Sequence, residues 1–282
     1  MKTILITGAS SGIGRDAALA LARTGHQVFV AARRTAALEA LALEASTIVP
    51  ITLDLDSPAS IAAAIAEIAT RTDGRGVDVL INNAGFATAG SLAELGDSAL
   101  RAQFETNVFG LMALTRGLLP AMIWRGSGRI INVSSVSGRI PAPILGAYHA
   151  SKYALEALSD ALRMELQPFG VQVVVIEPGT IRTEFASRAM TEATRDRSST
   201  SRYAQVYARA ATLEAKFDRL AGTTAPVVRA IERAVSRRRP SARYVAPRSF
   251  ALMIALVRLL PTCWADAAMQ RMFGLTRKQL AT

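Results

Sequence analysis

The sequence is poor in residue types that would each support a particular class of protein. It contains one cysteine, Cys263, in 282 residues, which excludes a framework of internal disulfides and favours a reducing compartment. Only 6% of the residues are aromatic while 50% are hydrophobic, so the core must consist mainly of Ala, Val, Ile and Leu. Such a core is typical of a parallel sheet that is covered by helices.

Long hydrophobic segments are also missing. The amino-terminal run MKTILIT ends at Gly8, before the apolar core of a signal peptide develops. The longest late stretch, FALMIALVRLLP at 250–261, is too short to span a bilayer and contains Arg258. We therefore expect a cytoplasmic protein.

Acidic residues are scarce, with 22 Asp and Glu against 33 Lys and Arg, and the net charge is +11. Arginine supplies most of the positive charge, including the run RRRP at 237–240. No aromatic residues interleave with this run and no DNA- or RNA-binding motif is present, so we expect solvated helix arginines and no nucleic-acid partner. Attraction to phosphorylated or acidic ligands, or to an anionic membrane surface, stays open. No His, Cys, Asp and Glu cluster has metal-ligand spacing, so no metal is predicted.

Short β-branched runs alternate with Ala-rich stretches of helical periodicity. This alternation predicts an α/β fold with a doubly wound, parallel, seven-stranded sheet, helices on both faces and a helical C-terminal extension. The expected strands are 2–7, 27–32, 48–53, 77–82, 129–134, 171–176 and 243–246, and the expected helices are 12–24, 35–45, 57–72, 97–124 and 146–168. We expect one domain over 1–248, with the polar segment 184–223 as a flap over a site, and an extension over 249–282.

Unusual polar and glycine clusters follow six of the expected strands. In strand order they are Gly8–Gly14, Arg33–Arg34, Asp54, Asn82–Gly85, Ser134–Ser135 and Pro178–Thr183. Ligands of doubly wound sheets bind beyond the carboxyl ends of the strands, so these clusters predict a binding site at one edge of the sheet.

The first cluster, TGASSGIG at 7–14, lies between a strand and a helix. Gly8 permits a tight turn, and Gly12 and Gly14 would let the backbone and the helix approach a pyrophosphate closely. The helix amino terminus would then face the phosphates. The cluster lacks the Gly-Lys-Ser/Thr of a P-loop, so we do not expect nucleotide hydrolysis.

A second motif, GAYHASKYAL at 146–155, places Tyr148 and Lys152 four residues apart on one face of a helix. An unperturbed tyrosine has a pKa of about 10, and a lysine charge about 5 Å away favours the phenolate by roughly 3 kcal/mol at an effective dielectric near 20. The pair could act as an acid/base catalyst, although an inward Tyr beside a solvent-facing Lys has the same spacing. His149 is expected to point away from the pair and to serve packing or pocket lining.

Several motifs together resemble one protein family. TGASSGIG, NNAG at 82–85, Asn107, Ser135, YHASK at 148–152 and PGTIRT at 178–183 occur in the order of the short-chain dehydrogenase/reductase family. The resemblance is to its single-domain Tyr-x-x-x-Lys type and covers residues 1–183. IEPG at 176–179 and the long tail resemble its retinol and hydroxysteroid dehydrogenase branch.

This resemblance implies a catalytic set of Asn107, Ser135, Tyr148 and Lys152. Tyr148 would exchange a proton with the substrate oxygen, and Lys152 would lower the pKa of Tyr148 and bind the nicotinamide ribose. Ser135 would hold the substrate oxygen together with Tyr148; Ser134 is the competing candidate, but the interval to Tyr148 favours Ser135. Asn107 would bind a water that relays protons to Lys152.

The resemblance also implies a nicotinamide dinucleotide site. Its residues would be Gly8, Ser10, Ser11, Gly12, Ile13, Gly14, Arg33, Arg34, Asp54, Leu55, Asn82, Ala84, Gly85, Tyr148, Lys152, Pro178, Gly179, Ile181 and Thr183. Arg33 and Arg34 end the second strand with no carboxylate until Glu39, which favours the 2′-phosphate of NADP(H) over NAD(H). The alternative is two solvated arginines. Asp54 would contact the adenine or cap the next helix.

We therefore expect an NADP-dependent oxidoreductase that interconverts an alcohol and a carbonyl of a small apolar substrate, acting as a homodimer or homotetramer. One alternative is an NADPH-sensing regulatory protein with little turnover, which would not need the complete catalytic set. Another is an extended-type epimerase or dehydratase, which would need a larger C-terminal domain. The tail has Phe250, Met253, Ile254 and Val257 at helical spacing. We expect it to close an apolar pocket together with 184–223, with weak membrane contact as a second possibility.

Overall fold

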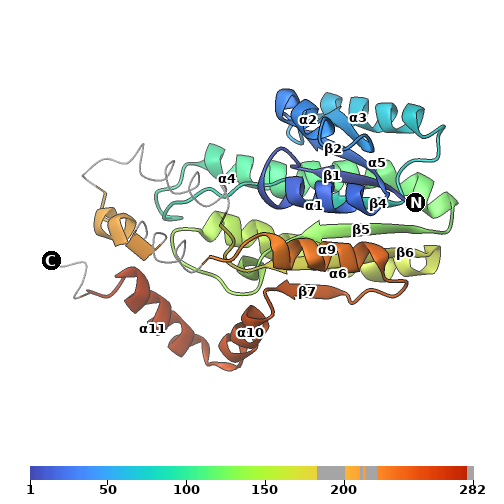
Figure 1. Ribbon diagram of the computed structural model, residues 1–282. Helices are drawn as coiled ribbons and strands as arrows, with labels where there is room; N and C mark the ends of the chain where they lie inside the picture. The colour runs from blue at the N-terminus through green and yellow to red at the C-terminus, as the bar shows by residue number, and fades with distance from the viewer. Residues whose placement is uncertain (183–200, 210–211, 214–220, 278–282) are drawn as a thin grey trace.

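The computed structural model describes residues 1–182, 201–209, 212–213 and 221–277. Its centre is a parallel sheet of seven strands in the order β3-β2-β1-β4-β5-β6-β7 (Figure 1). The strands are β1 Thr3–Thr7, β2 Gln27–Ala32, β3 Ile48–Thr52, β4 Val79–Asn82, β5 Gly128–Val133, β6 Val171–Pro178 and β7 Arg243–Ala246. The doubly wound sheet is confirmed. Its strand order reverses between β1 and β4, where folds of this kind form a ligand crevice.

Helices cover both faces of the sheet. They are α1 Gly12–Arg23, α2 Thr35–Ala42, α3 Pro58–Arg71, α4 Asp97–Phe104, α5 Leu111–Trp124, α6 Gly146–Leu166, α9 Ala225–Ser236, α10 Ser249–Leu259 and α11 Thr262–Phe273. One apolar cluster joins the sheet to α1, α2 and α9, and a second joins its other face to α3, α5 and the end of α6. The central strands are buried on both faces, which explains their continuous runs of β-branched and aliphatic residues.

The sequence predicted one helix over 97–124, whereas the structure divides this stretch into three helical segments. Residues Glu105–Gly110 form a π-helix between α4 and α5. Gly110 lies so close to the loop after β3 that a Cβ there would overlap the carbonyl oxygen of Leu55. Among the described residues, Asp97–Trp124 is the one helical stretch long and apolar enough to cross a membrane, and half of its most apolar window is buried here. The contacts of α5 with α3 and β5 are those of a core helix.

The C-terminal extension consists of α10 and α11, as expected. The two helices form a bent pair that extends from the sheet edge at β7 toward the side where the C-terminus lies (Figure 1). The preceding helix, α9, was not identified from the sequence. It has a strongly one-sided apolar face, with Val227, Ile231 and Val235 fully buried on the sheet.

Candidate active site

The glycine-rich turn between β1 and α1 packs tightly on the loop after β4. Gly8 has φ of +67°, and a Cβ on it would lie 2.7 Å from Cα of Ala84. A Cβ on Gly14 would lie 2.5 Å from both Nδ2 of Asn83 and the carbonyl oxygen of Gly8. Gly14 is therefore required by packing within the protein, whereas the sequence suggested only close approach of a ligand. Gly12, with φ of +56°, opens α1.

Asn83 and Thr7 hold this turn in place, although their positions in NNAG and TGASSGIG did not indicate this role. Asn83 Nδ2 donates to the carbonyl oxygens of Thr7 at 3.0 Å and of Gly8 at 3.2 Å. The Thr7 hydroxyl accepts from the backbone N–H groups of Asn83 at 3.1 Å and of Ala84 at 3.0 Å. The repeated Asn of NNAG, directly after a strand, was the available signal.

The neighbouring Asn82 has a different environment. Its side chain is buried, and Nδ2 donates to Thr115 Oγ1 at 3.0 Å and to Asn132 Oδ1 at 2.9 Å. Asn132 in turn donates to Ser159 Oγ of α6 at 2.8 Å. The amide of Asn82 therefore ties β4 to β5 and α5. That Asn82 lines the nucleotide cleft stays a prediction, and its side-chain amide is engaged within the protein.

The two arginines after β2 have different surroundings. Arg34 Nη2 donates to Ser10 Oγ at 2.9 Å and to Ser11 Oγ at 3.3 Å, so its guanidinium lies against the glycine-rich turn. Arg33 is exposed at the same strand end. A groove of about 580 Å³ opens beside the turn, lined by Ser10, Ser11, Gly12, Arg15, Asp16, Arg182 and Ala221–Thr224. Cations and a helix amino terminus together favour an anion here.

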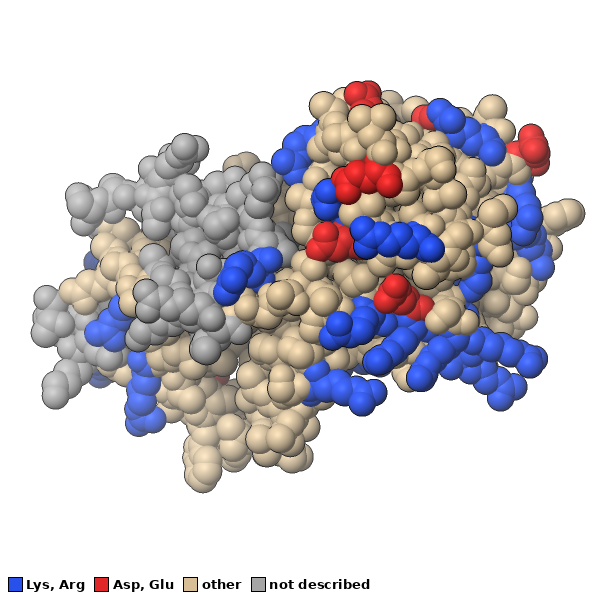
Figure 2. Space-filling view, in the orientation of Figure 1, with Lys and Arg blue, Asp and Glu red and all other residues tan. Residues whose placement is uncertain are grey.

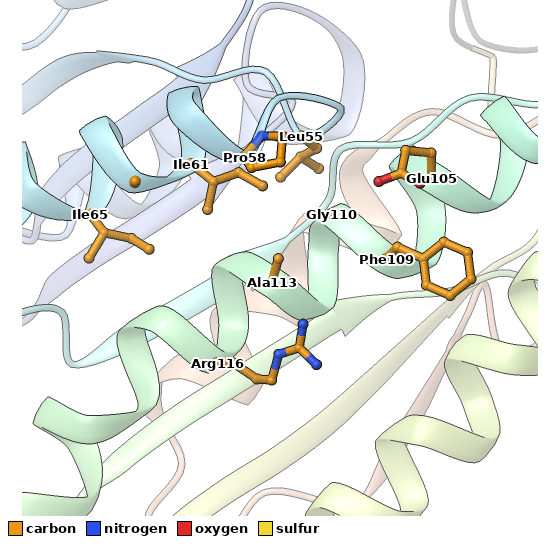
Figure 3. A pocket seen from close by; sticks show the side chains of 10 residues that line it. Leu55, Pro58, Ile61, Ile65, Glu105, Phe109, Gly110, Ala113 and Arg116 are labelled. Carbon is orange, nitrogen blue, oxygen red and sulfur yellow. The ribbon is translucent and has the colours of Figure 1, made fainter.

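Asp54 and Leu55 follow β3. Asp54 Oδ1 accepts from the backbone N–H of Asp56 at 3.1 Å. The residue that caps α3 is Ser57, whose hydroxyl accepts from Ser60 N at 3.2 Å, so Asp54 is not the cap. The side chain of Leu55 is buried beside a groove of about 320 Å³ between α3 and the π-helix and α5 (Figure 3). The Leu55 side chain thus lines this groove, its carbonyl oxygen packs against Gly110, and a cofactor contact of Leu55 stays a prediction.

Ser135, Tyr148 and Lys152 lie together at the carboxyl end of β5, and all three are buried. The Ser135 hydroxyl accepts from Ser137 N at 3.0 Å and hydrogen-bonds to Tyr148. Lys152 Nζ lies 5.9 Å from the centre of the Tyr148 ring and donates to the carbonyl oxygen of Val133 at 2.8 Å. The three side chains form the core of the predicted catalytic set, and Tyr148 and Lys152 share a face of α6 as their spacing predicted.

Burial changes the acidity of both helix residues. It raises the pKa of Tyr148 to about 12, against an opposing effect of the hydrogen bond with Ser135. It lowers the pKa of Lys152 to about 8, opposed by the negative charge of Glu156. That Lys152 lowers the pKa of Tyr148 in the working enzyme therefore stays a prediction. The ammonium is directed at the Val133 carbonyl, and burial of the phenol dominates.

Lys152→Met is expected to stabilise the protein at pH 7. The pKa of Lys152 is about 8 when folded and near 10.5 when unfolded, so the folded state disfavours the charged form. This cost is complete below pH 8 and disappears as the pH rises to about 10.5. Allowing for the lost hydrogen bond, we expect the free energy of unfolding to rise by about 2 kcal/mol at pH 7. Urea unfolding of the native and variant proteins at pH 7 and pH 10 measures this difference in the free energy of unfolding. A less stable variant at pH 7, or an equal gain at both pH values, would contradict the assignment.

Asn107 lies in the π-helix and its amide is fully engaged. Nδ2 donates to the carbonyl oxygen of Phe86 at 3.0 Å and to Ser151 Oγ at 3.1 Å, while Oδ1 accepts from Phe86 N at 3.1 Å. A Cβ on Gly85 would lie 3.0 Å from Oδ1, which explains the glycine of NNAG. Asn107 therefore links the loop after β4 to α6, and its role in binding a relay water stays a prediction.

His149 and a buried ion-pair network complete the surroundings of α6. His149 is buried, with Nδ1 2.9 Å from the carbonyl oxygen of Ser137, so it serves packing, as expected. Glu177 of IEPG pairs with Arg139 at 2.7 Å. Arg243 of β7 pairs with Glu156 and Asp160 of α6 at 3.1 Å and 2.7 Å, and with Glu177 at 3.3 Å. The network fixes α6 relative to the ends of β6 and β7. No sequence pattern indicated this network.

The loop after β6 contacts the C-terminal extension. Pro178 is the last residue of β6, and Gly179 N donates to the carbonyl oxygen of Ala246 at 2.9 Å. A Cβ on Gly179 would overlap the ring of Phe250 of α10. Ile181 is buried and forms an isolated bridge with Gly222. Thr183 lies outside the described residues, as does most of the expected flap over 184–223.

A third apolar cluster lies over the loops that follow β4 and β5. Val206 and Tyr207, from the described part of the expected flap, pack there with Phe273 of α11, Ala89 and Ile144. The Tyr207 hydroxyl accepts from Ser91 N at 3.1 Å and hydrogen-bonds to Glu94 Oε2 at 3.1 Å. Parts of 201–213 and of the tail therefore meet beside the catalytic end of the sheet.

The fold and site define a Rossmann-type nucleotide-binding enzyme with a buried Ser-Tyr-Lys set. The chain matches the short chain dehydrogenase family over residues 2–194, and it belongs to that family. It is 47% identical over 184 residues to Uncharacterized oxidoreductase YbbO of Escherichia coli, covering 65% of this chain and 67% of that protein. It is 40% identical to bovine Dehydrogenase/reductase SDR family member 7B, covering 67% and 60%. Probable short-chain type dehydrogenase/reductase VdlC of Helicobacter pylori is 34% identical over 98% of both chains.

Solved structures agree with this assignment. A short-chain dehydrogenase from Streptomyces avermitilis superposes with a TM-score of 0.78 at 33% identity, covering 95% of this chain and 97% of that chain. One from Burkholderia phymatum in complex with NAD gives 0.78 at 25% identity over 91% and 92%. One from Sphingobium yanoikuyae in complex with NADPH gives 0.71 at 29% identity over 93% and 97%. The chain is therefore an NAD(P)-dependent oxidoreductase of alcohols and carbonyls.

Proposed function

We propose that this oxidoreductase prefers NADP(H) over NAD(H). The observation that carries the proposal is the position of Arg34, whose guanidinium lies on the hydroxyls of Ser10 and Ser11 at the turn. Arg33 adds a second exposed cation at the same strand end. Solved relatives bind NAD in one case and NADPH in another, so the choice depends on this chain's own residues. An arginine here matches the 2′-phosphate of NADP, whereas an acidic residue would match the ribose hydroxyls of NAD.

The Arg33→Ala/Arg34→Ala double variant should bind NADPH about 10- to 100-fold more weakly, with little change for NADH. A charge-assisted hydrogen bond to phosphate contributes about 1.5–3 kcal/mol. Titration of the intrinsic fluorescence with each cofactor measures both dissociation constants. The Arg237→Ala/Arg238→Ala variant removes an equally exposed pair far along the chain and serves as the control. Equal losses for NADPH and NADH would overturn the cofactor proposal.

The proposed catalytic roles follow from the geometry of α6 and β5. When bound, the nicotinamide supplies or accepts a hydride. Tyr148 would give its proton to the carbonyl oxygen during reduction and remove one from the alcohol during oxidation. Ser135 would hold that same oxygen, and Lys152 would stabilise the phenolate as it forms and bond the ribose. Asn107 would fix the loop after β4 and offer its main chain to a relay water.

We propose that the substrate is an apolar alcohol or carbonyl of steroid, retinoid, lipid or aromatic character. The third apolar cluster, with Val206, Tyr207 and Phe273, supports this proposal because it brings apolar side chains of 201–213 and α11 to the catalytic edge. Phe250 of the tail also packs against Gly179, which belongs to the expected nicotinamide site. Residues 184–223 would act as the flap and 249–282 as the extension of a catalytic domain over 1–248. An NADPH sensor with little turnover is the alternative, and the intact buried Ser135, Tyr148 and Lys152 argue against it.

Deleting residues 249–282 should raise the Michaelis constant for long-chain aldehydes about tenfold more than for short ones. Each buried CH₂ group contributes about 0.8 kcal/mol, so losing contact with two of them gives that ratio. Steady-state kinetics with aldehydes of increasing chain length measures it, and circular dichroism checks that the variant is folded. Phe273→Ala is the milder version of the same test. Equal effects on long and short substrates would contradict a substrate role for the tail.

We also propose a cytoplasmic homodimer or homotetramer. The single, exposed Cys263 supports a reducing compartment. Exposed apolar side chains on α6 and the π-helix support self-association, among them Phe109, Tyr153 and Met164. Light scattering on the purified protein measures the oligomeric state.

A further inference from the structure

Helix α10 has two apolar faces, of which the protein covers one. Ile254 is buried and Phe250 and Val257 are half-buried, so this face packs on the domain. The opposite face exposes Leu252, Met253, Leu256 and Leu259, and Leu259 is 82% exposed. A helix that is apolar all round is normally buried on all sides. The outer face of α10 is therefore suited to contact something beyond the chain.

The exposed apolar surface continues through the turn into α11. Leu260 and Trp264 are exposed beside Leu259, and Met272 is exposed farther along α11. The turn LLPTCW at 259–264 forms the protruding end of the bent pair in Figure 1. Exposed leucine, methionine and tryptophan side chains thus gather on these two helices and the turn between them, and we call them the exposed patch. Tryptophan at such a tip is typical of a group placed at a membrane–water interface.

The charges around this patch indicate which kind of partner surface could cover it. Between Pro247 and Thr282 the only acidic residue is Asp266, whereas the basic residues are Arg248, Arg258, Arg271, Arg277 and Lys278. All four arginines are exposed. In Figure 2 the protruding lower part of the molecule is tan, with blue side chains on either side. A two-fold contact between copies would bring these cations together, whereas the headgroups of an anionic bilayer would pair with them.

We propose that α10 and α11 dock on the surface of an anionic lipid bilayer. Leu256, Leu259, Leu260 and Trp264 would enter the boundary between headgroups and acyl chains, and Arg258 and Arg271 would remain among the headgroup phosphates. The pair lies on the membrane and does not cross it, since α10 has only 11 residues. The inner face of the same helices contacts Gly179 and Tyr207, so docking places the catalytic edge beside the membrane. Docking requires neither cofactor nor substrate, so its measurement is separate from activity.

The two tryptophans of the chain allow the contact to be located. Trp124→Phe leaves Trp264 as the only tryptophan, and Trp264→Phe leaves Trp124, which is more exposed and lies at the end of α5. Each variant is mixed with vesicles of phosphatidylcholine and phosphatidylglycerol. We expect a blue shift and quenching by brominated lipid for the Trp264 protein and neither change for the Trp124 protein. Responses from both tryptophans, from Trp124 alone or from neither would overturn the proposal.

Vesicle flotation of the full chain then tests which side chains bind. Leu259→Gln/Trp264→Gln should reduce the partition coefficient about tenfold or more, because both apolar anchors are lost. The matched control, Leu43→Gln/Trp124→Gln, removes a Leu and a Trp elsewhere that are even more exposed, and it should bind as the native protein does. Arg258→Gln/Arg271→Gln should remove the preference for phosphatidylglycerol over pure phosphatidylcholine. Equal losses in both Leu/Trp pairs would overturn the proposal. So would a native dimer that Leu259→Gln/Trp264→Gln converts to a monomer, since a second copy would then cover the patch.

Discussion

Tyr148→Phe is expected to lower turnover by about a thousandfold while NADPH binding persists. The change removes the hydroxyl that Ser135 bonds and leaves the ring in its buried position on α6. Proton transfer by a positioned side chain typically contributes 10²- to 10⁴-fold to rate. Single-turnover kinetics of NADPH oxidation, together with a cofactor titration, separates the chemical step from binding. Tyr153→Phe makes the same change on an exposed tyrosine of α6 and should be neutral.

Two outcomes would contradict this assignment of Tyr148. If the phenylalanine variant keeps most of its activity, another group transfers the proton. If it loses NADPH binding to the same extent, Tyr148 serves to form the cofactor site, and the lower rate follows from missing cofactor and not from a missing proton donor. The high pKa of Tyr148, about 12, means that its phenol is protonated at neutral pH and is suited to donate a proton during reduction.

The sheet could be predicted from sequence because its strands are buried on both faces. Such strands appear as continuous runs of β-branched and aliphatic residues, as in QVFVAA of β2, and glycine or polar clusters mark their ends. Tyr148 and Lys152 were recognisable because helical spacing alone places them on one face. Both features depend on local sequence, and the structure places them as expected.

Other features depend on contacts between distant segments. Asn82 and Asn83 are adjacent, yet the amide of Asn82, the last residue of β4, bonds to β5 and α5, while that of Asn83, in the following loop, holds the glycine-rich turn. The π-helix has the same apolar pattern as the α-helices beside it, so periodicity cannot identify it. Arg139, Glu177 and Arg243 come from three separate segments. Whether burial or a neighbouring charge controls the pKa of Tyr148 depends on the packed structure.

Gly14→Ala is expected to weaken dinucleotide binding about 100-fold. On an isolated helix this substitution would stabilise by roughly 1 kcal/mol, because alanine is the better helix former. Here the new methyl group would lie 2.5 Å from Asn83 Nδ2 and from the carbonyl oxygen of Gly8. Both belong to the hydrogen bonds that shape the turn, so the turn must move away from α1. Losing one charge-assisted hydrogen bond to phosphate costs about 1.5–3 kcal/mol, so a displaced turn should weaken binding by on the order of 100-fold.

Isothermal titration with NADPH and thermal unfolding together measure this effect. Gly96→Ala is the matched control, because it adds a methyl group at a negative φ where the nearest atom, Ser98 Oγ, is 4.0 Å away. We expect the Gly14 variant to lose both affinity and stability, and the Gly96 variant to keep both nearly unchanged. Normal NADPH affinity in Gly14→Ala would show that the turn does not shape the cofactor site. A loss of stability with normal affinity in the folded protein would limit Gly14 to packing between α1 and the loop after β4.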